Sequence, residues 1–204
     1  MIIGGGGHAS VLTEILVKQN RKILGILSPE PIGHRKVFTG IEHYVKDSKI
    51  LSYSIDEIKL VNGIGMLPNS NLRYQLYNHF KNYGYKFESV IDETARISMN
   101  ADIADDAQVL ANSTIQTGVK IGNNSIINSG AIIEHDCKIG DSVHIATGAV
   151  ISGGGSIGSN TFVGAGSVVI QEISIGESVC LGAGTLVLKD VESNFKTKRK
   201  KVEK

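Results

Sequence analysis

The chain has 204 residues, of which 41% are hydrophobic and 20% are charged, and its formal net charge at pH 7 is +1. These values are ordinary for a soluble globular protein with one large or two smaller domains. A nearly neutral chain has no bulk attraction to nucleic acid or to an anionic membrane, so we expect neither as a partner.

The compartment is indicated by features that the sequence lacks. No signal peptide opens the chain, and no run of about 18 apolar residues could span a bilayer. The two cysteines, Cys137 and Cys180, lie at unrelated phases of the repeat described below, which argues against a disulfide framework. We therefore expect a cytoplasmic protein.

The first residues predict a strand, a glycine-rich turn and a helix. Residues 1–3 are apolar, and Gly4, Gly6 and Ala9 then take the small positions of a G-x-G-x-x-G/A turn. Apolar residues at helical spacing follow from Val11 to Leu16. The backbone N–H groups of such a turn can hold a phosphate or carboxylate, although four glycines also suit a plain tight turn.

The rest of the N-terminal part predicts a small Rossmann-like α/β domain with a parallel sheet. Its further expected elements are strands at 23–27, around 49–53 and at 59–65, and a helix from Leu72 to about Tyr83. Asn71 is the expected cap of that helix, and Gly84 ends it. Glu30 is a poor match to the acidic residue that a dinucleotide-binding unit places after its second strand, which argues against a nicotinamide cofactor.

A branched aliphatic residue then returns at every sixth position without a break. The series is Ile91, Ile97, Ile103, Val109, Ile115, Ile121, Ile127, Ile133, Ile139, Ile145, Ile151, Ile157, Val163, Val169, Ile175, Leu181 and Val187. A period of six fits neither a helix nor a two-sided strand, but it fits a coil of short parallel strands that each turn one residue inward.

Two further positions keep the same period. The residue after the aliphatic one is often glycine, which suits a sharp corner, and the residue two before it is mostly small, which suits a narrow interior. We therefore predict a parallel β-helix over about 89–188. The expected domains are an N-terminal domain at 1–87, a coil domain at 88–190 and a basic tail at 191–204. We expect the tail to be frayed and solvated, with contact to ligand phosphates as the alternative.

Two histidines, His135 and His144, lie within the coil. His135 lies two places after the inward Ile133, at a phase where the side chain leaves the core, and Glu134 and Asp136 flank it. An imidazole held by a carboxylate at one ring nitrogen can accept a proton at the other, near neutral pH. The alternative is a solvent-exposed histidine in a polar corner.

These features resemble the hexapeptide-repeat acyltransferases, whose coil is an all-β left-handed parallel β-helix. The chain as a whole is similar to bacterial sugar acyltransferases with a small nucleotide-binding N-terminal domain, namely the nucleotide-linked amino-sugar N-acetyltransferases and the sialic acid O-acetyltransferases. The resemblance rests on the glycine-rich opening that ends at Ala9, the loop and helix at 65–73, the run 134–140 with His144, and the stretch 148–164. It implies that residues about eighteen apart stack and that three chains associate.

The resemblance also implies roles for individual residues. The catalytic base falls on His135, with Asp136 orienting it, and His144 falls on a position that contacts acetyl-CoA near the thioester. Gly153 matches the residue whose backbone N–H faces the thioester carbonyl. The other matched positions are Gly164 and Ala165 along the pantetheine groove, and Gly6, Gly7 and His8 in the turn that holds the nucleotide-sugar. No covalent intermediate is implied, and Cys137, at an inward position, is a poor nucleophile.

In a homotrimer we expect each active site to lie between two chains, with His135 on one wall and Gly153 on the other.

Two departures from the family pattern concern the ligands. Ser28-Pro29-Glu30 leaves the nucleotide's identity open, and residues 192–198 replace the Gly-x-Pro-Ala-Lys segment that closes the coil near the adenine end of the cofactor.

We therefore expect an acetyl-CoA-dependent N-acetyltransferase that acts on a nucleotide-linked amino sugar in bacterial surface glycan biosynthesis. O-acetylation of a sialic acid and a non-catalytic binding module are the alternatives. A zinc-dependent β-helix carbonic anhydrase needs three histidine ligands, and the coil has only His135 and His144, so we expect no metal.

Overall fold

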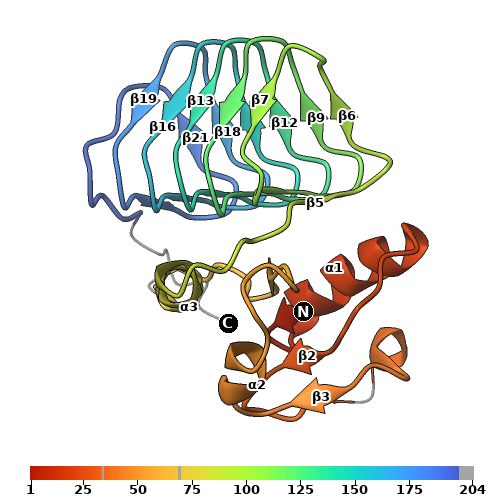
Figure 1. Cartoon of the computed structure of the whole chain (residues 1–204). Helices are drawn as coiled ribbons and strands as arrows, with labels where there is room; N and C mark the ends of the chain where they lie inside the picture. The colour runs from red at the N-terminus through yellow and green to blue at the C-terminus, as the bar shows by residue number, and fades with distance from the viewer. Residues whose placement is uncertain (34, 69, 198–204) are drawn as a thin grey trace, which may run out of the picture. The chain divides into compact units, whose positions relative to one another are not determined.

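The computed structural model describes residues 1–33, 35–68 and 70–197, which divide into two compact units, Met1–Val90 and the chain from Ile91 onward (Figure 1). None of the helices within these described ranges is long and apolar enough to cross a membrane. Residues 198–204, which are half of the predicted basic tail, lie outside the described residues.

The first unit is a four-stranded parallel sheet with helices, as predicted. Its strands are β1 (Ile2–Ile3), β2 (Ile26–Leu27), β3 (His43–Tyr44) and β4 (Val61–Asn62), in the order β3-β2-β1-β4. Its helices are α1 (Gly7–Lys18), α2 (Ser48–Leu51), α3 (Leu72–Asn82) and the short 3-10 turn η1 (Lys36–Phe38). The apolar core of this unit includes the fully buried Leu60 and Phe80.

The strand predicted around 49–53 is wrong, because that segment begins with helix α2. The helical turn buries Ile50 completely and lets the Lys49 ammonium lie over the rings of Tyr44 and Tyr53. Helix α3 ends one residue before the predicted Tyr83, and Gly84 follows with a φ of 91°. Asn71 is its N-cap by position, but the Asn71 side chain makes no capping hydrogen bond.

The second unit is a coil of two-residue parallel strands in three sheets, which confirms the predicted β-helix. The strands are β5 (Val90–Ile91), β6 (Arg96–Ile97), β7 (Asp102–Ile103), β8 (Gln108–Val109), β9 (Thr114–Ile115), β10 (Lys120–Ile121), β11 (Ile126–Ile127), β12 (Ile132–Ile133), β13 (Lys138–Ile139), β14 (His144–Ile145), β15 (Val150–Ile151), β16 (Ser156–Ile157), β17 (Phe162–Val163), β18 (Val168–Val169), β19 (Ser174–Ile175), β20 (Cys180–Leu181) and β21 (Leu186–Val187).

Every third strand belongs to the same sheet. The orders are β19-β16-β13-β10-β7, β20-β17-β14-β11-β8-β5 and β21-β18-β15-β12-β9-β6. Ile121 pairs with Ile139 and Ile133 with Ile151, which is the predicted stacking of residues eighteen apart.

The interior of the coil is the predicted aliphatic series. From Val109 to Val187 every member is buried, and the first three members are partly buried and pack on the same cluster. Hydroxyl residues at the small inward positions donate to carbonyls of the following turn, as Ser125 does to Gly140 over 2.8 Å and Thr161 to Gly176 over 2.8 Å. These bonds let polar residues enter an apolar interior without an unsatisfied group.

The corners lie at a different phase from the one predicted. Every sixth residue from Asn112 to Gly184 has a positive φ, between 53° and 74°, and this residue is three places after the aliphatic one. The glycine directly after the aliphatic residue has no positive φ. It is required for another reason: a Cβ at Gly158, for example, would lie 2.6 Å from the backbone nitrogen of Glu177 on the next turn. Coil stacking, rather than turn strain, therefore selects these glycines.

The coil continues past its predicted end. The N–H of Cys180 donates to the carbonyl of Phe195 over 2.8 Å, and the N–H of Thr197 donates to the carbonyl of Cys180 over 3.0 Å. The described part of the predicted tail is therefore paired with the last turn of the coil instead of being frayed.

Candidate active site

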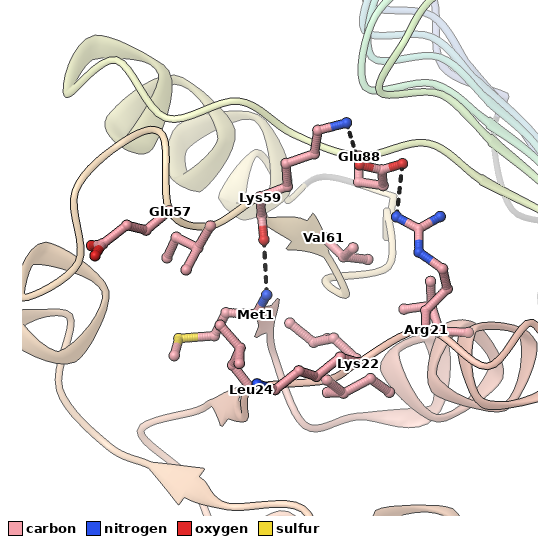
Figure 2. Close-up of a pocket in the computed structure, with 12 residues that line it drawn as sticks. Met1, Arg21, Lys22, Leu24, Glu57, Lys59, Val61 and Glu88 are labelled. Carbon is pink, nitrogen blue, oxygen red and sulfur yellow. Dashed lines mark hydrogen bonds and ion pairs between the residues drawn. The ribbon is translucent and has the colours of Figure 1, made fainter.

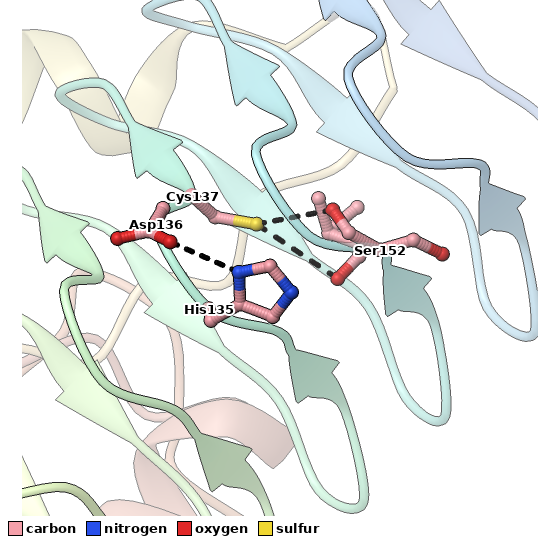
Figure 3. Close-up of polar contacts among 5 residues, drawn as sticks. His135, Asp136, Cys137 and Ser152 are labelled. Carbon is pink, nitrogen blue, oxygen red and sulfur yellow. Dashed lines mark hydrogen bonds and ion pairs between the residues drawn. The ribbon is translucent and has the colours of Figure 1, made fainter.

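The corner between β12 and β13 carries the predicted His135 and Asp136. His135 Nδ1 lies 2.9 Å from Asp136 Oδ2, and the two side chains are 61% and 71% exposed (Figure 3). Asp136 has a φ of 60°, a conformation that Asp adopts more readily than most residues. A proton on Nδ1 is donated to the carboxylate, which leaves the lone pair of Nε2 available to accept another proton.

Gly153 lies beside the His135 ring on the next turn of the same chain. A Cβ at position 153 would be 2.5 Å from His135 Nε2. The N–H of Gly153 has no acceptor among the described residues, while the N–H of Gly154 donates to the His135 carbonyl over 2.8 Å. The expectation that His135 and Gly153 come from two different chains is therefore wrong. The predicted stacking of residues eighteen apart places Gly153 beside His135 in the same chain, because 153 is 135 plus 18.

Cys137 points into the coil, as its phase predicted. Its side chain is fully buried, and Sγ donates to the Ser152 carbonyl over 3.2 Å (Figure 3). Burial raises the pKa of the Cys137 thiol, so the thiolate is disfavoured at neutral pH. Cys137 is therefore a poor nucleophile in this environment, as expected.

His144, Gly164 and Ala165 form a second group. His144 is on β14, 8% exposed, with Nε2 3.1 Å from Asn128 Nδ2 and its ring edge-on to Phe162 at 5.1 Å. Gly164 and Ala165 directly follow β17, the strand that pairs with β14. This group therefore lies along another sheet, at the corner where each turn passes on to the sheet of β12 and β15. His135 lies at the next corner of the turn, where the chain passes on to the sheet of β13 and β16. The described structure does not bring the two groups together within one chain.

Gly6, Gly7 and His8 lie in the first unit, at the carboxyl end of β1. Gly6 is the N-cap of α1, and nothing lies within 4 Å of where a Cβ would stand at Gly6 or Gly7. A Cβ at Gly63 would be 2.8 Å from the Ala9 methyl group, which shows why the third small position of the turn is needed. The space beside Gly6 and Gly7 is thus open at the carboxyl end of the sheet, where α/β proteins bind ligands.

The opposite edge of this sheet has a pocket of about 350 Å³ (Figure 2). Glu88 contacts Arg21 at 3.0 Å and Lys59 at 2.6 Å there. Burial alone would raise the pKa of Glu88, but hydrogen bonds from Lys59 and Arg21 and their charges hold it below its ordinary value. The Met1 ammonium donates to the Lys59 carbonyl over 2.8 Å, and burial lowers its pKa to about 6. None of the predicted site residues lines this pocket.

Across the described parts of the chain, no group of three or more His, Cys, Asp or Glu side chains is arranged to hold a metal ion.

Comparisons with known families and structures cover most of the chain. The model of the PglD N-terminal domain matches residues 1–80. The bacterial transferase hexapeptide model matches residues 100–134 and 118–153, and the hexapeptide repeat of succinyl-transferase matches residues 156–189. A search of curated proteins found no match.

Solved structures are similar over nearly the full length. A point mutant of perosamine N-acetyltransferase from Caulobacter crescentus, in complex with CoA and GDP-perosamine, is 29% identical, with a TM-score of 0.85 over 96% of this chain and 90% of that chain. The acetyltransferase domain of PglB from Neisseria gonorrhoeae FA1090, in complex with acetyl coenzyme A, is 26% identical, with a TM-score of 0.86 over 96% and 93%. With the coil, the parallel N-terminal sheet and these matches, the chain belongs to the hexapeptide-repeat acetyltransferases that carry a PglD-type N-terminal domain.

Proposed function

We propose that the protein transfers the acetyl group of acetyl-CoA to the amino group of a nucleotide-linked amino sugar, in bacterial surface glycan biosynthesis. The observation that carries this proposal is the His135–Asp136 pair, in which a carboxylate holds Nδ1 and Nε2 lies beside Gly153. The open turn at Gly6 and Gly7 supports a phosphate-bearing acceptor. The similar structures that contain GDP-perosamine, CoA or acetyl-CoA support the same substrate classes.

The chemistry needs one base and one hydrogen-bond donor. His135 Nε2 accepts a proton from the amine as its nitrogen attacks the thioester carbon, and general bases contribute about 10²–10⁴-fold. The free N–H of Gly153 donates to the oxyanion of the tetrahedral intermediate. When the intermediate collapses, the C–S bond breaks and the imidazolium donates its proton to the thiolate of CoA. The products are the acetamido sugar and CoA.

We also propose that the enzyme is a homotrimer in which two chains form each site. The His135–Asp136 pair and the group around His144 lie at different corners of one chain. A second chain is therefore needed to place one chain's pair opposite the other chain's His144 group. The sheet that leads into the corner of the His135–Asp136 pair also has an apolar outer face on four of its six strands. The outward residues there are Ile132, Val150, Val168 and Leu186, of which Val168 is 37% and Leu186 60% exposed, while β6 and β9 turn Arg96 and Thr114 outward.

Subunit mixing tests the shared site. Chains with His135→Ala are mixed with chains with His144→Ala and allowed to exchange, and each parent is inactive or nearly so. In a site built from two chains, some mixed trimers regain one intact site and activity reappears. If proven exchange restores no activity, both groups act from one chain, and a fully active monomer in sedimentation would contradict the trimer altogether.

A substrate screen tests the reaction. The purified protein is incubated with acetyl-CoA and UDP-, GDP- or dTDP-linked amino sugars, and released thiol is measured, with His135→Ala as the matched control. We expect acceptor-dependent thiol release from at least one amino sugar. Release only with free or CMP-linked sialic acid would instead identify the O-acetyltransferase alternative. The absence of any acetyl-CoA-induced thermal shift would favour a non-catalytic module.

A further inference from the structure

We propose that two glycines, Gly153 and Gly118, position the His135–Asp136 pair because each leaves space for one of its side chains. Their effect on catalysis rests on the function proposed above, whereas their effect on the geometry of the pair does not. Gly153 lies at the corner between β15 and β16, one turn after the pair and eighteen residues from His135. Gly118 lies at the corner between β9 and β10, one turn before the pair and eighteen residues from Asp136.

Gly153 is unusual for its phase in the repeat. It lies two places after an aliphatic residue, and from Glu93 to Lys189 every other residue at this phase has a side chain. Gly153 does not have the positive φ that would favour glycine. Neither the corner's backbone nor the stacking of the coil therefore explains a glycine here.

The His135 ring explains it. A Cβ at position 153 would lie 2.5 Å from Nε2, 2.6 Å from Cε1 and 3.1 Å from Cδ2 of His135. The Nε2 end of the ring thus occupies the volume that any side chain at 153 would need. The same placement brings Nε2 next to the free N–H of Gly153, so that the proposed base and the proposed oxyanion donor lie side by side.

Gly118 does the same for Asp136 on the preceding turn. Its Cβ would overlap Asp136 Oδ1. The φ of Gly118 is 74°, but Asn112, Asn124 and Asn160 adopt a similar φ at the same phase, so the backbone alone does not require glycine. Gly130 shows the contrast, because nothing lies within 4 Å of where its Cβ would stand.

The pair is therefore fixed across three successive turns of one corner. Asp136 Oδ1 lies against Gly118, Asp136 Oδ2 accepts from His135 Nδ1, and His135 Nε2 lies against Gly153. A side chain at either glycine displaces one partner and breaks the 2.9 Å contact that selects the tautomer with the proton on Nδ1. By this argument both glycines are positioning residues for the base.

The experiment compares Gly153→Ala and Gly118→Asn with the control Gly130→Asn. Gly153→Ala keeps the backbone N–H, and Asn is tolerated at the phase of positions 118 and 130, so each variant mainly adds atoms. The first readout needs no substrate: ¹⁵N chemical shifts of the His135 ring at alkaline pH, assigned by their loss in His135→Ala. We expect Nδ1–H in the wild type and the control, and a mixture of tautomers in the two test variants.

The second readout is kinetic. We expect kcat to fall about 10–100-fold in both test variants, with acetyl-CoA affinity within about twofold, since a displaced base acts only on the chemical step. In an Asp136→Asn background Gly118→Asn should cost less than in the wild type, because the pair it disturbs has already been altered.

A wild-type ring spectrum in folded Gly153→Ala and Gly118→Asn would overturn the inference. So would equal tautomer changes in Gly130→Asn. If the tautomer shifts as expected while the wild type acetylates no amino sugar, the positioning role stands and the proposed function fails.

Discussion

Removing the His135 imidazole separates the chemistry of the site from the stability of the coil. The side chain is 61% exposed and its contact with Asp136 is exposed as well, so His135→Ala should change the free energy of unfolding by no more than about 1 kcal/mol. If the ring is the general base, kcat should fall about 10²–10⁴-fold. At about 1.36 kcal/mol per factor of ten, this corresponds to about 2.7–5.4 kcal/mol of lost transition-state stabilisation.

Asp136→Asn is the matched variant, since Asn also adopts a positive φ at this phase of the coil. Its amide oxygen can still accept from Nδ1–H, but the charge is lost. Hydrogen bonds to charged groups exceed neutral ones by about 1 kcal/mol, so we expect kcat to fall only about fivefold.

The assay measures thiol release at saturating acetyl-CoA, at a pH where the acceptor amine is mostly protonated, together with the melting temperature of each variant. A kcat of His135→Ala within about threefold of wild type would remove His135 from the mechanism. A kcat loss that follows a large drop in melting temperature would refute the separation of site and coil.

Two further predictions concern stability. Ile133→Asp puts an unpaired charge at a fully buried position and should unfold the coil, whereas Ile97→Asp, at a partly buried position, should cost less; equal melting temperatures for Ile133→Asp and wild type would place Ile133 outside the core. Because the folded state lowers the pKa of Glu88, its ion pairs stabilise the protein above the ordinary value of 4.5, and this contribution is lost as pH falls through the lowered pKa. Glu88→Gln should therefore lower the urea midpoint at pH 7 by the equivalent of about 1 kcal/mol but not near pH 2, and a difference that persists at pH 2 would contradict this.

The coil could be predicted from the sequence because each turn repeats the same steric requirement for inward aliphatic residues. One inward aliphatic residue per six, from Ile91 to Val187, fixed both the strands and their register, and the structure follows it throughout. The N-terminal unit has no such redundancy. Its strands are two residues long, too short to show a period, so α2 was mistaken for a strand and His43–Tyr44 was missed.

The repeat predicted the direction of the site's side chains better than it predicted their neighbours on adjacent turns. The phase of His135 predicted an outward side chain, and Asp136 was the adjacent carboxylate. The glycines that hold the pair were within reach of the same reasoning, because Gly153 and Gly118 lie one turn of the register from it. The resemblance implies a role only for the N–H of Gly153, whereas the structure shows that its missing side chain also leaves room for the His135 ring.

The exposure of the His135–Asp136 pair gives a chemical reason for the proposed trimer, which would exclude water from the site. Hydrogen-bond donors and bases act most strongly on a reacting centre from which water is excluded, because the low dielectric strengthens each charge interaction. In a single chain both His135 and Asp136 are more than half exposed, so this condition is not met. The apolar outer residues from Ile132 to Leu186 run along the sheet that leads into this corner. A neighbouring chain packed on them would exclude water from the corner and place its own His144 group opposite the base, so burial of one apolar face would both assemble the protein and complete the site.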